Sequence, residues 1–151
     1  MNDQAGAHLV RIQIDREHYE SPSPTTGEAL YELGKVPEHK GLLREVSGDH
    51  EDKFIPRETP VVHLKMDEHL YTEAVVTIVV EGTAHEWPKG EISYAQVVTL
   101  EVPDYAHHHE ITYSVKYKDG PHSKPEGVLA PGASVKVKEG MIFSVSETGQ
   151  S

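Results

Sequence analysis

Residues 92–98, ISYAQVV, and residues 111–118, ITYSVKYK, are the two stretches that decide the fold of this chain. In the first stretch, Ser93 precedes Gln96 by three positions, which is the capping-box spacing at the start of a helix. The second stretch alternates apolar and polar residues with period two, as a half-buried strand does. The sequence therefore predicts a small α+β domain in which a helix packs on one face of a sheet.

Strand patterns lie on both sides of these two stretches. They are residues 76–80, the turn Glu81-Gly82, and residues 85–88, then residues 127–129, 134–138 and 141–145. Glu139-Gly140 predicts a hairpin turn between the last two strands. The polar residues 147–151 are expected to form an extended, flexible C-terminal tail.

The N-terminal half repeats the same order of elements. A helix is predicted to start at Thr25, with Glu28 at the capping-box position, and to end at Gly34. Strands are predicted around it at residues 8–15, 18–20, 42–46, 53–55, 61–65 and 69–72.

Apolar and capping residues of the two halves correspond at nearly constant offsets. Val10 and Ile12 lie 66 residues before Val76 and Ile78, Thr25 lies 68 before Ser93, and Val62, Leu64 and Leu70 lie 73 before Val135, Val137 and Phe143. A period of roughly 70 residues indicates a domain duplication. The order of elements is that of a β-grasp fold. We predict two tandem β-grasp (ubiquitin-like) domains, residues 8–73 and 74–146, each a mixed sheet with one main helix, with Glu73-Ala74 as the linker.

Charge and composition exclude several classes of function. The chain has 25 Asp and Glu against 14 Lys and Arg, a net charge of −11. Such a surface repels nucleic-acid phosphates and anionic lipids and favours a basic protein partner. The absence of cysteine excludes disulfides, thiolate metal sites and a cysteine nucleophile. The first residues show no signal-peptide pattern, so we expect a soluble, cytoplasmic protein.

Five short segments of the C-terminal half form a distinctive combination, namely ISY (92–94), ITYSVKY (111–117), KPEG (124–127), PG (131–132) with SVKVK (134–138), and GMIF (140–143). Together they resemble the bacterial multiubiquitin domain family, ubiquitin-like modifiers encoded beside ubiquitin-type conjugation enzymes of the BilA type. The resemblance covers roughly residues 75–151. The N-terminal half shares only the order of elements and a similar helix start at Gly27 and Leu30.

The resemblance implies that the protein is not an enzyme but a substrate of enzymes. An E1-like activating enzyme would adenylate the C-terminal carboxylate, and an E2-like conjugating enzyme would pass it to an amine of a target protein, possibly a phage structural protein. A JAB-type metallopeptidase would trim the precursor or reverse the conjugate. The family association is with antiphage defence.

The chain end offers one residue for this chemistry. Gly149 is the only glycine after Gly140 and has no side chain to obstruct attack on its acyl group. We expect Gly149 to be the conjugation terminus after removal of Gln150 and Ser151. We expect Lys116, Lys118, Glu147 and Thr148 to be the contacts for the enzymes. The family's paired terminal glycines are absent, so a frayed tail on a non-covalent tandem β-grasp adaptor is the alternative.

No residue pattern predicts catalysis, a cofactor or a metal. No nucleophile elbow, phosphate loop or HExxH motif occurs. Neighbouring residues of an extended chain point to opposite faces, so His107, His108 and His109 cannot all converge on one ion. A solvated loop sensitive to pH near 6.5 is favoured there. Trp87 is expected to cover the helix of the second domain, with an exposed partner contact as the alternative.

Overall fold

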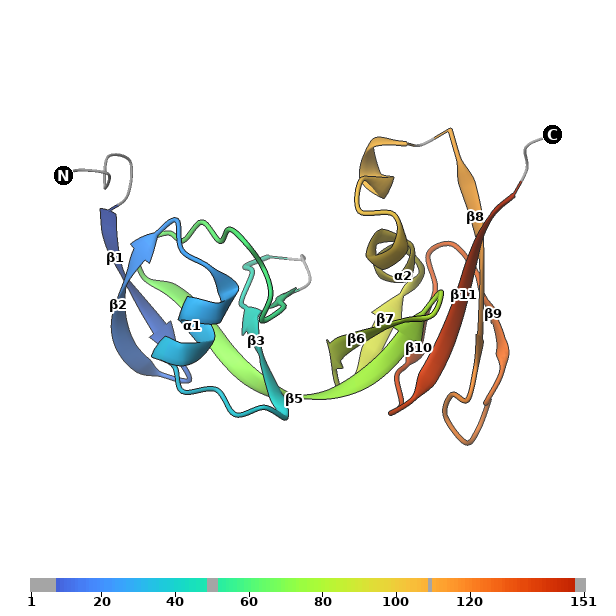
Figure 1. Cartoon of the computed structure of the whole chain (residues 1–151), viewed down its shortest axis with the longest axis horizontal. Helices are drawn as coiled ribbons and strands as arrows, with labels where there is room; N and C mark the ends of the chain where they lie inside the picture. The colour runs from blue at the N-terminus through green and yellow to red at the C-terminus, as the bar shows by residue number, and fades with distance from the viewer. Residues whose placement is uncertain (1–7, 49–51, 109, 149–151) are drawn as a thin grey trace. The chain divides into compact units, whose positions relative to one another are not determined.

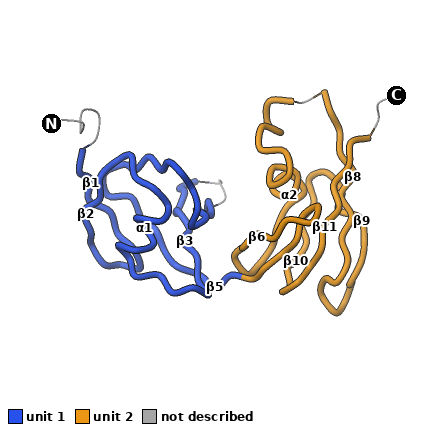
Figure 2. Tube along the Cα trace, in the orientation of Figure 1, with its two compact units in different colours: residues 1–75 blue, residues 76–151 orange. Residues whose placement is uncertain are grey.

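The protein is described by a computed structural model that covers residues 8–48, 52–108 and 110–148. The chain divides into two compact units, residues 1–75 and 76–151 (Figure 2). The division falls inside one strand, β5 (Glu68–Val80), so Glu73 and Ala74 belong to a strand and not to a linker. Each unit carries a mixed sheet and one α-helix, an α+β arrangement consistent with a β-grasp fold (Figure 1).

Unit 1 has the strand order β2-β1-β5-β3-β4, in which β1 and β5 are parallel and the other pairs antiparallel. Its elements are β1 (His8–Ile14), β2 (Glu17–Ser23), α1 (Gly27–Leu33), β3 (Lys40–Arg44), β4 (Lys53–Ile55) and the first part of β5. Asp15 and Arg16 join β1 to β2 with φ of 51° and 75°. Positive φ at both turn residues matches the twist of a two-residue hairpin.

The start of α1 lies one residue later than predicted. The hydroxyl of Thr26, not Thr25, accepts a hydrogen bond from the N–H of Ala29 at 3.0 Å. Thr25 instead exchanges two backbone hydrogen bonds with Val62, at 2.9 and 2.8 Å. An extended residue paired in this way is not available as a helix cap. The helix ends at Gly34, as predicted.

Residues 61–65 do not form the predicted strand. The segment makes only the isolated bridge between Thr25 and Val62. Two residues later, the backbone N–H of Leu64 donates to the hydroxyl of Ser23 at 2.8 Å, and the same hydroxyl bonds the Leu64 carbonyl at 3.1 Å. The Ser23 hydroxyl therefore bonds the backbone groups of Leu64 that a neighbouring strand would otherwise bond.

Unit 2 has the strand order β6-β5-β11-β8-β9, with the last part of β5 parallel to β11. Its further elements are β6 (Thr83–Pro88), β7 (Glu91–Ser93), α2 (Tyr94–Glu101), the 3-10 helix η2 (Tyr105–His107), β8 (Thr112–Lys118), β9 (Gly127–Leu129), β10 (Ser134–Lys136) and β11 (Met141–Thr148). The predicted capping box is present, because Ser93 and Gln96 each accept the other's backbone N–H, at 3.1 and 2.8 Å.

The predicted hairpin around Glu139-Gly140 is wrong. β10 pairs with β7, whereas β11 pairs with β5 and β8. Gly140 turns the chain with φ of 84°, and its N–H donates to the carbonyl of Thr77 at 2.7 Å. A tight turn here redirects the chain into a different sheet, and long-range pairing decides its partner.

The offsets seen in the sequence recur in the strand registers. Ile14 lies opposite Leu70 in the parallel pair of unit 1, and Val80 lies opposite Phe143 in that of unit 2. These are the same 66- and 73-residue offsets as in the sequence. The helix offset is 67 and not 68, because Thr26 is the counterpart of Ser93.

Each unit has its own hydrophobic core between helix and sheet. In unit 1 it is Val10, Ile12, Ile14, Leu30, Tyr31, Val36, Leu42, Ile55, Val62, Leu64 and Leu70. In unit 2 it is Val76, Ile78, Val80, Ile92, Tyr94, Val97, Val98, Tyr113, Val115, Tyr117, Leu129, Met141, Phe143 and Val145. Each large aliphatic side chain buried here contributes about 1.5–3 kcal/mol relative to full exposure. No helix among the described residues is long and apolar enough to cross a membrane.

Candidate functional site

The β8 strand separates buried aromatic residues from exposed polar ones. Tyr113, Val115 and Tyr117 face the core, while Lys116 and Lys118 are exposed on the opposite side of the sheet from α2. The side chains alternate because successive residues of a strand point to opposite faces. The aromatic side of β8 is therefore core, and the lysines lie on what we call the outer face of unit 2.

The neighbours of the two lysines define this outer face. Lys116 lies opposite Ser144 of β11 and opposite Val128 of β9. Lys118 lies opposite Ile142. Val128 is 66% exposed. The outer face thus combines two cations, a hydroxyl and apolar surface within one sheet.

The last described part of the chain belongs to this sheet. β11 runs beside β8 as far as Thr148, which lies opposite Thr112 (Figure 1). The Thr112 hydroxyl donates to the Thr148 carbonyl at 3.2 Å and lies 2.9 Å from the Thr148 hydroxyl. Residues 147 and 148 are therefore strand residues, whereas the sequence had placed them in the flexible tail.

The predicted enzyme contacts fall on two sides of the sheet. Thr148 shares the outer face with Lys116 and Lys118, four residues or ~13 Å along the strand from the Lys116 register. Glu147 lies on the other side, opposite Tyr113. Burial and then the Glu147 charge raise the pKa of the Tyr113 hydroxyl. Gly149, Gln150 and Ser151 lie outside the described residues.

A histidine of the α2–β8 connection is held by two acids. The Nε2 atom of His108 lies 2.9 Å from Asp104, and its Nδ1 atom lies 3.4 Å from Glu110. These hydrogen bonds raise the pKa of His108 and the His108 contact lowers that of Asp104. Sequence reasoning missed this i,i+4 pair, although the spacing was visible. No group suited to a metal ion occurs among the described residues, and His109 lies outside them.

The matching face of unit 1 is built differently. Leu43 and Tyr71, which are paired across β3 and β5, hold the positions of Lys116 and Ser144. Leu43 is only 8% exposed. The Tyr71 hydroxyl donates to Asp52 at 2.6 Å, which lowers the pKa of Asp52, while burial and Asp52 raise that of Tyr71. This closed polar contact was not predicted, because no sequence pattern joins residues 19 positions apart.

Trp87 packs against the core of unit 2 and is half-buried. Its Nε1–H donates to the carbonyl of Glu91 at 3.2 Å. A large aromatic ring with its polar atom bonded to the backbone serves packing. Trp87 therefore packs against the core of unit 2, while its contact with α2 stays a prediction.

Residues 76–149 match the family model described as Multiubiquitin. The match shows that the sequence of unit 2 is similar to a ubiquitin-like domain of the multiubiquitin type. It spans the whole described part of unit 2 and ends at Gly149. No curated protein matches the chain.

Proposed function

We propose that the protein is a bacterial ubiquitin-like modifier whose two units are tandem β-grasp domains. It acts in the cytoplasm as a substrate of E1- and E2-like enzymes of the BilA type, and not as an enzyme. A JAB-type peptidase removes Gln150 and Ser151, and the carboxylate of Gly149 is then joined to target proteins in antiphage defence.

One observation carries this proposal. The unit that matches the Multiubiquitin model has its last strand, β11, in the centre of the sheet, parallel to β5 and ending at Thr148. β11 pairs with β5 at residues 141–143 and with β8 as far as Thr148, the residue before Gly149. The family match also ends at that residue.

The proposed reaction needs only the terminal carboxylate from this chain. The carboxylate of Gly149 attacks the α-phosphate of ATP, which forms an acyl adenylate and releases pyrophosphate. An enzyme cysteine displaces AMP to form a thioester, and a target amine then displaces the thiol to form an amide. Glycine suits each attack because no side chain crowds the acyl carbon.

The outer face of unit 2 is the proposed surface for the activating enzyme. Lys116 and Lys118 are exposed there beside Val128, on the same side as Thr148. We expect Lys116→Glu with Lys118→Glu to weaken binding of the activating enzyme at least tenfold. The matched control is Lys136→Glu with Lys138→Glu, which makes the same change in net charge on residues outside β8. Equal effects of the two double variants would remove the outer face from the proposal.

The decisive assay is thioester formation by the activating enzyme with ATP. Protein ending at Gly149 is expected to form a thioester that reducing agent cleaves. Protein ending at Thr148 is expected to form none, although the two differ by one glycine. Mass spectrometry with the peptidase should show loss of Gln150 and Ser151. If both forms remain free, the non-covalent adaptor is the better description.

A further inference from the structure

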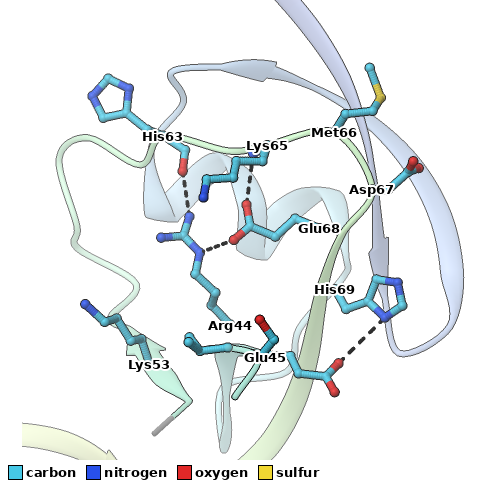
Figure 3. A pocket seen from close by; sticks show the side chains of 11 residues that line it. Arg44, Glu45, Lys53, His63, Lys65, Met66, Asp67, Glu68 and His69 are labelled. Atoms are coloured by element: carbon cyan, nitrogen blue, oxygen red, sulfur yellow. Dashed lines mark hydrogen bonds and ion pairs between the residues drawn. The ribbon is translucent and has the colours of Figure 1, made fainter. Parts of the chain in front are cut away.

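A polar pocket of about 530 Å³ opens on unit 1, on the side of the sheet where β3, β4 and the segment before β5 meet (Figure 3). Arg44, Lys53 and Lys65 line it from three different parts of the chain. Its volume lies in the range of pockets that hold ligands. Three cations around one cavity are notable in a protein whose net charge is −11.

The arginine at the centre of the pocket is held in a fixed position. Its Nε atom lies 2.6 Å from the Glu68 carboxylate, and its Nη2–H donates to the His63 carbonyl at 2.7 Å. Glu68 also accepts the backbone N–H of Lys65 at 2.9 Å. The Arg44 and Glu68 side chains are only 23% and 13% exposed.

Unit 2 shows that the fold does not require an ion pair here. Arg44 lies opposite Leu70 as Tyr117 lies opposite Phe143, and Glu68 lies opposite Ile12 as Met141 lies opposite Ile78. Tyr117 and Met141 are both buried in the core of unit 2. Apolar packing is often as stabilising as a partly buried ion pair, or more so. Stability therefore does not account for a charged pocket in unit 1.

Two of the three acids of the pocket are paired with arginines. Glu68 pairs with Arg44, and Asp67 lies 3.1 Å from Arg11. Glu45 lies 3.6 Å from His69, which is charged only when it is protonated. Neither Lys53 nor Lys65 has an ion-pair partner among the described residues. Two unpaired lysines against the one carboxylate that has no arginine partner leave the pocket with a net positive charge.

We infer that this pocket binds an acidic peptide segment of a partner protein, with carboxylates placed at Lys53 and Lys65 around the fixed Arg44. A peptide fits better than a single small anion because the cations come from three segments around a cavity of several hundred cubic ångströms. Guanidinium and ammonium groups are the usual donors to carboxylates. The inference does not depend on conjugation through Gly149.

The test is fluorescence anisotropy of a labelled hexaglutamate peptide with blocked ends, titrated with the full chain at low salt. Saturable one-to-one binding is expected. Lys53→Glu with Lys65→Glu should weaken it at least tenfold. The control is Lys136→Glu with Lys138→Glu, in which Lys138 is the unit 2 counterpart of Lys65. This control changes net charge equally and should shift affinity less than twofold.

A second double variant, in which both lysines become uncharged, separates loss of charge from loss of folding. Lys53→Gln with Lys65→Gln should weaken binding about threefold while circular dichroism stays unchanged. The inference is overturned if hexaglutamate does not saturate, or if the two charge-reversed pairs weaken binding alike. It is also overturned if inorganic phosphate displaces the peptide more effectively than sodium chloride of equal ionic strength, because the site would then be one for free oxyanions.

Discussion

The carboxylate of Glu81 accepts a hydrogen bond from the backbone N–H of Val145 at 2.8 Å. Asp15 makes the same bond to the N–H of Thr72 in unit 1, at 2.9 Å. Both acids are the first residue of a hairpin turn, with φ of 48° and 51°. In each unit, an acidic turn residue of the first hairpin is therefore hydrogen-bonded to the last strand.

Removing this bond is expected to destabilise unit 2. Glu81→Ala leaves the Val145 N–H without its partner, at a cost of about 1–2 kcal/mol for a partly buried donor. Urea unfolding monitored by Trp87 fluorescence measures this loss of stability, because the only tryptophan of the chain lies in unit 2. Glu86→Ala, an exposed acid of β6, is the control and should be neutral. Equal midpoints for the two variants would contradict the role of Glu81.

A tyrosine hydroxyl bridges two paired strands in unit 1. Tyr31 accepts the N–H of Leu42 at 2.9 Å and donates to the carbonyl of Ile55, the residue opposite Leu42. Tyr31→Phe leaves both groups buried and unpaired, and we expect a loss of about 1–3 kcal/mol. Hydrogen-exchange mass spectrometry should show faster exchange in residues 40–44.

The control for this prediction is Tyr19→Phe, since Tyr19 is half-buried at the edge of the same core. It should leave the exchange of residues 40–44 unchanged. Unchanged exchange in Tyr31→Phe as well would mean that the hydroxyl does not join β3 to β4.

Local sequence patterns predicted where the helices and strands lie better than they predicted which strands pair. Period-two alternation located β8, and the Ser93–Gln96 spacing located the start of α2, because both signals arise within a few residues. The turn at Gly140 was also predicted correctly, but the two strands on either side of it do not pair with each other. The partners of β11 are strands distant in sequence, and local spacing carries no information on them.

For the same reason, the sequence predicted only some of the residues of the candidate sites. Alternation correctly assigned Lys116 and Lys118 to the exposed face of β8. The pocket around Arg44 was not predicted, since it joins residues from β3, β4 and the segment before β5. Arg44 also occupies a position where unit 2 has the buried Tyr117, so the repeat gives no indication of a charged pocket there.

The α2–β8 connection is expected to respond to pH through His108. Its pKa is raised above the ordinary 6.5 by Asp104 and Glu110, so its contribution to stability is full below pH 6.5 and is lost as pH rises through the folded-state value. NMR titration should give a His108 midpoint above 6.5 that falls in Asp104→Asn. His122→Gln, elsewhere in unit 2, should leave the midpoint unchanged. A midpoint insensitive to Asp104→Asn would contradict the pairing.

The hydrogen bond between Tyr71 and Asp52 in unit 1 leads to a separate prediction about the pKa of Asp52. The Tyr71 hydroxyl and the Val46 N–H hold the pKa of Asp52 below its ordinary 3.8. Its contribution to stability is therefore present above pH 3.8 and is lost as pH falls through the lower folded-state value. In Tyr71→Phe the Asp52 midpoint, followed by carboxyl NMR, should rise. Tyr19→Phe is the control, and a midpoint unchanged by Tyr71→Phe would show that the hydroxyl does not bond Asp52.

The most direct test of conjugation through Gly149 is mass spectrometry of tryptic peptides from cells that contain the conjugation enzymes. Lys138 is the last trypsin site of the chain, so a conjugate leaves residues 139–149, EGMIFSVSETG, attached to a lysine of another protein. We predict branched peptides with this remnant, joined through the Gly149 carbonyl and absent when the chain ends at Thr148. Recovery of the C-terminal peptide only in unbranched form, under conditions where the enzymes are active, would contradict conjugation.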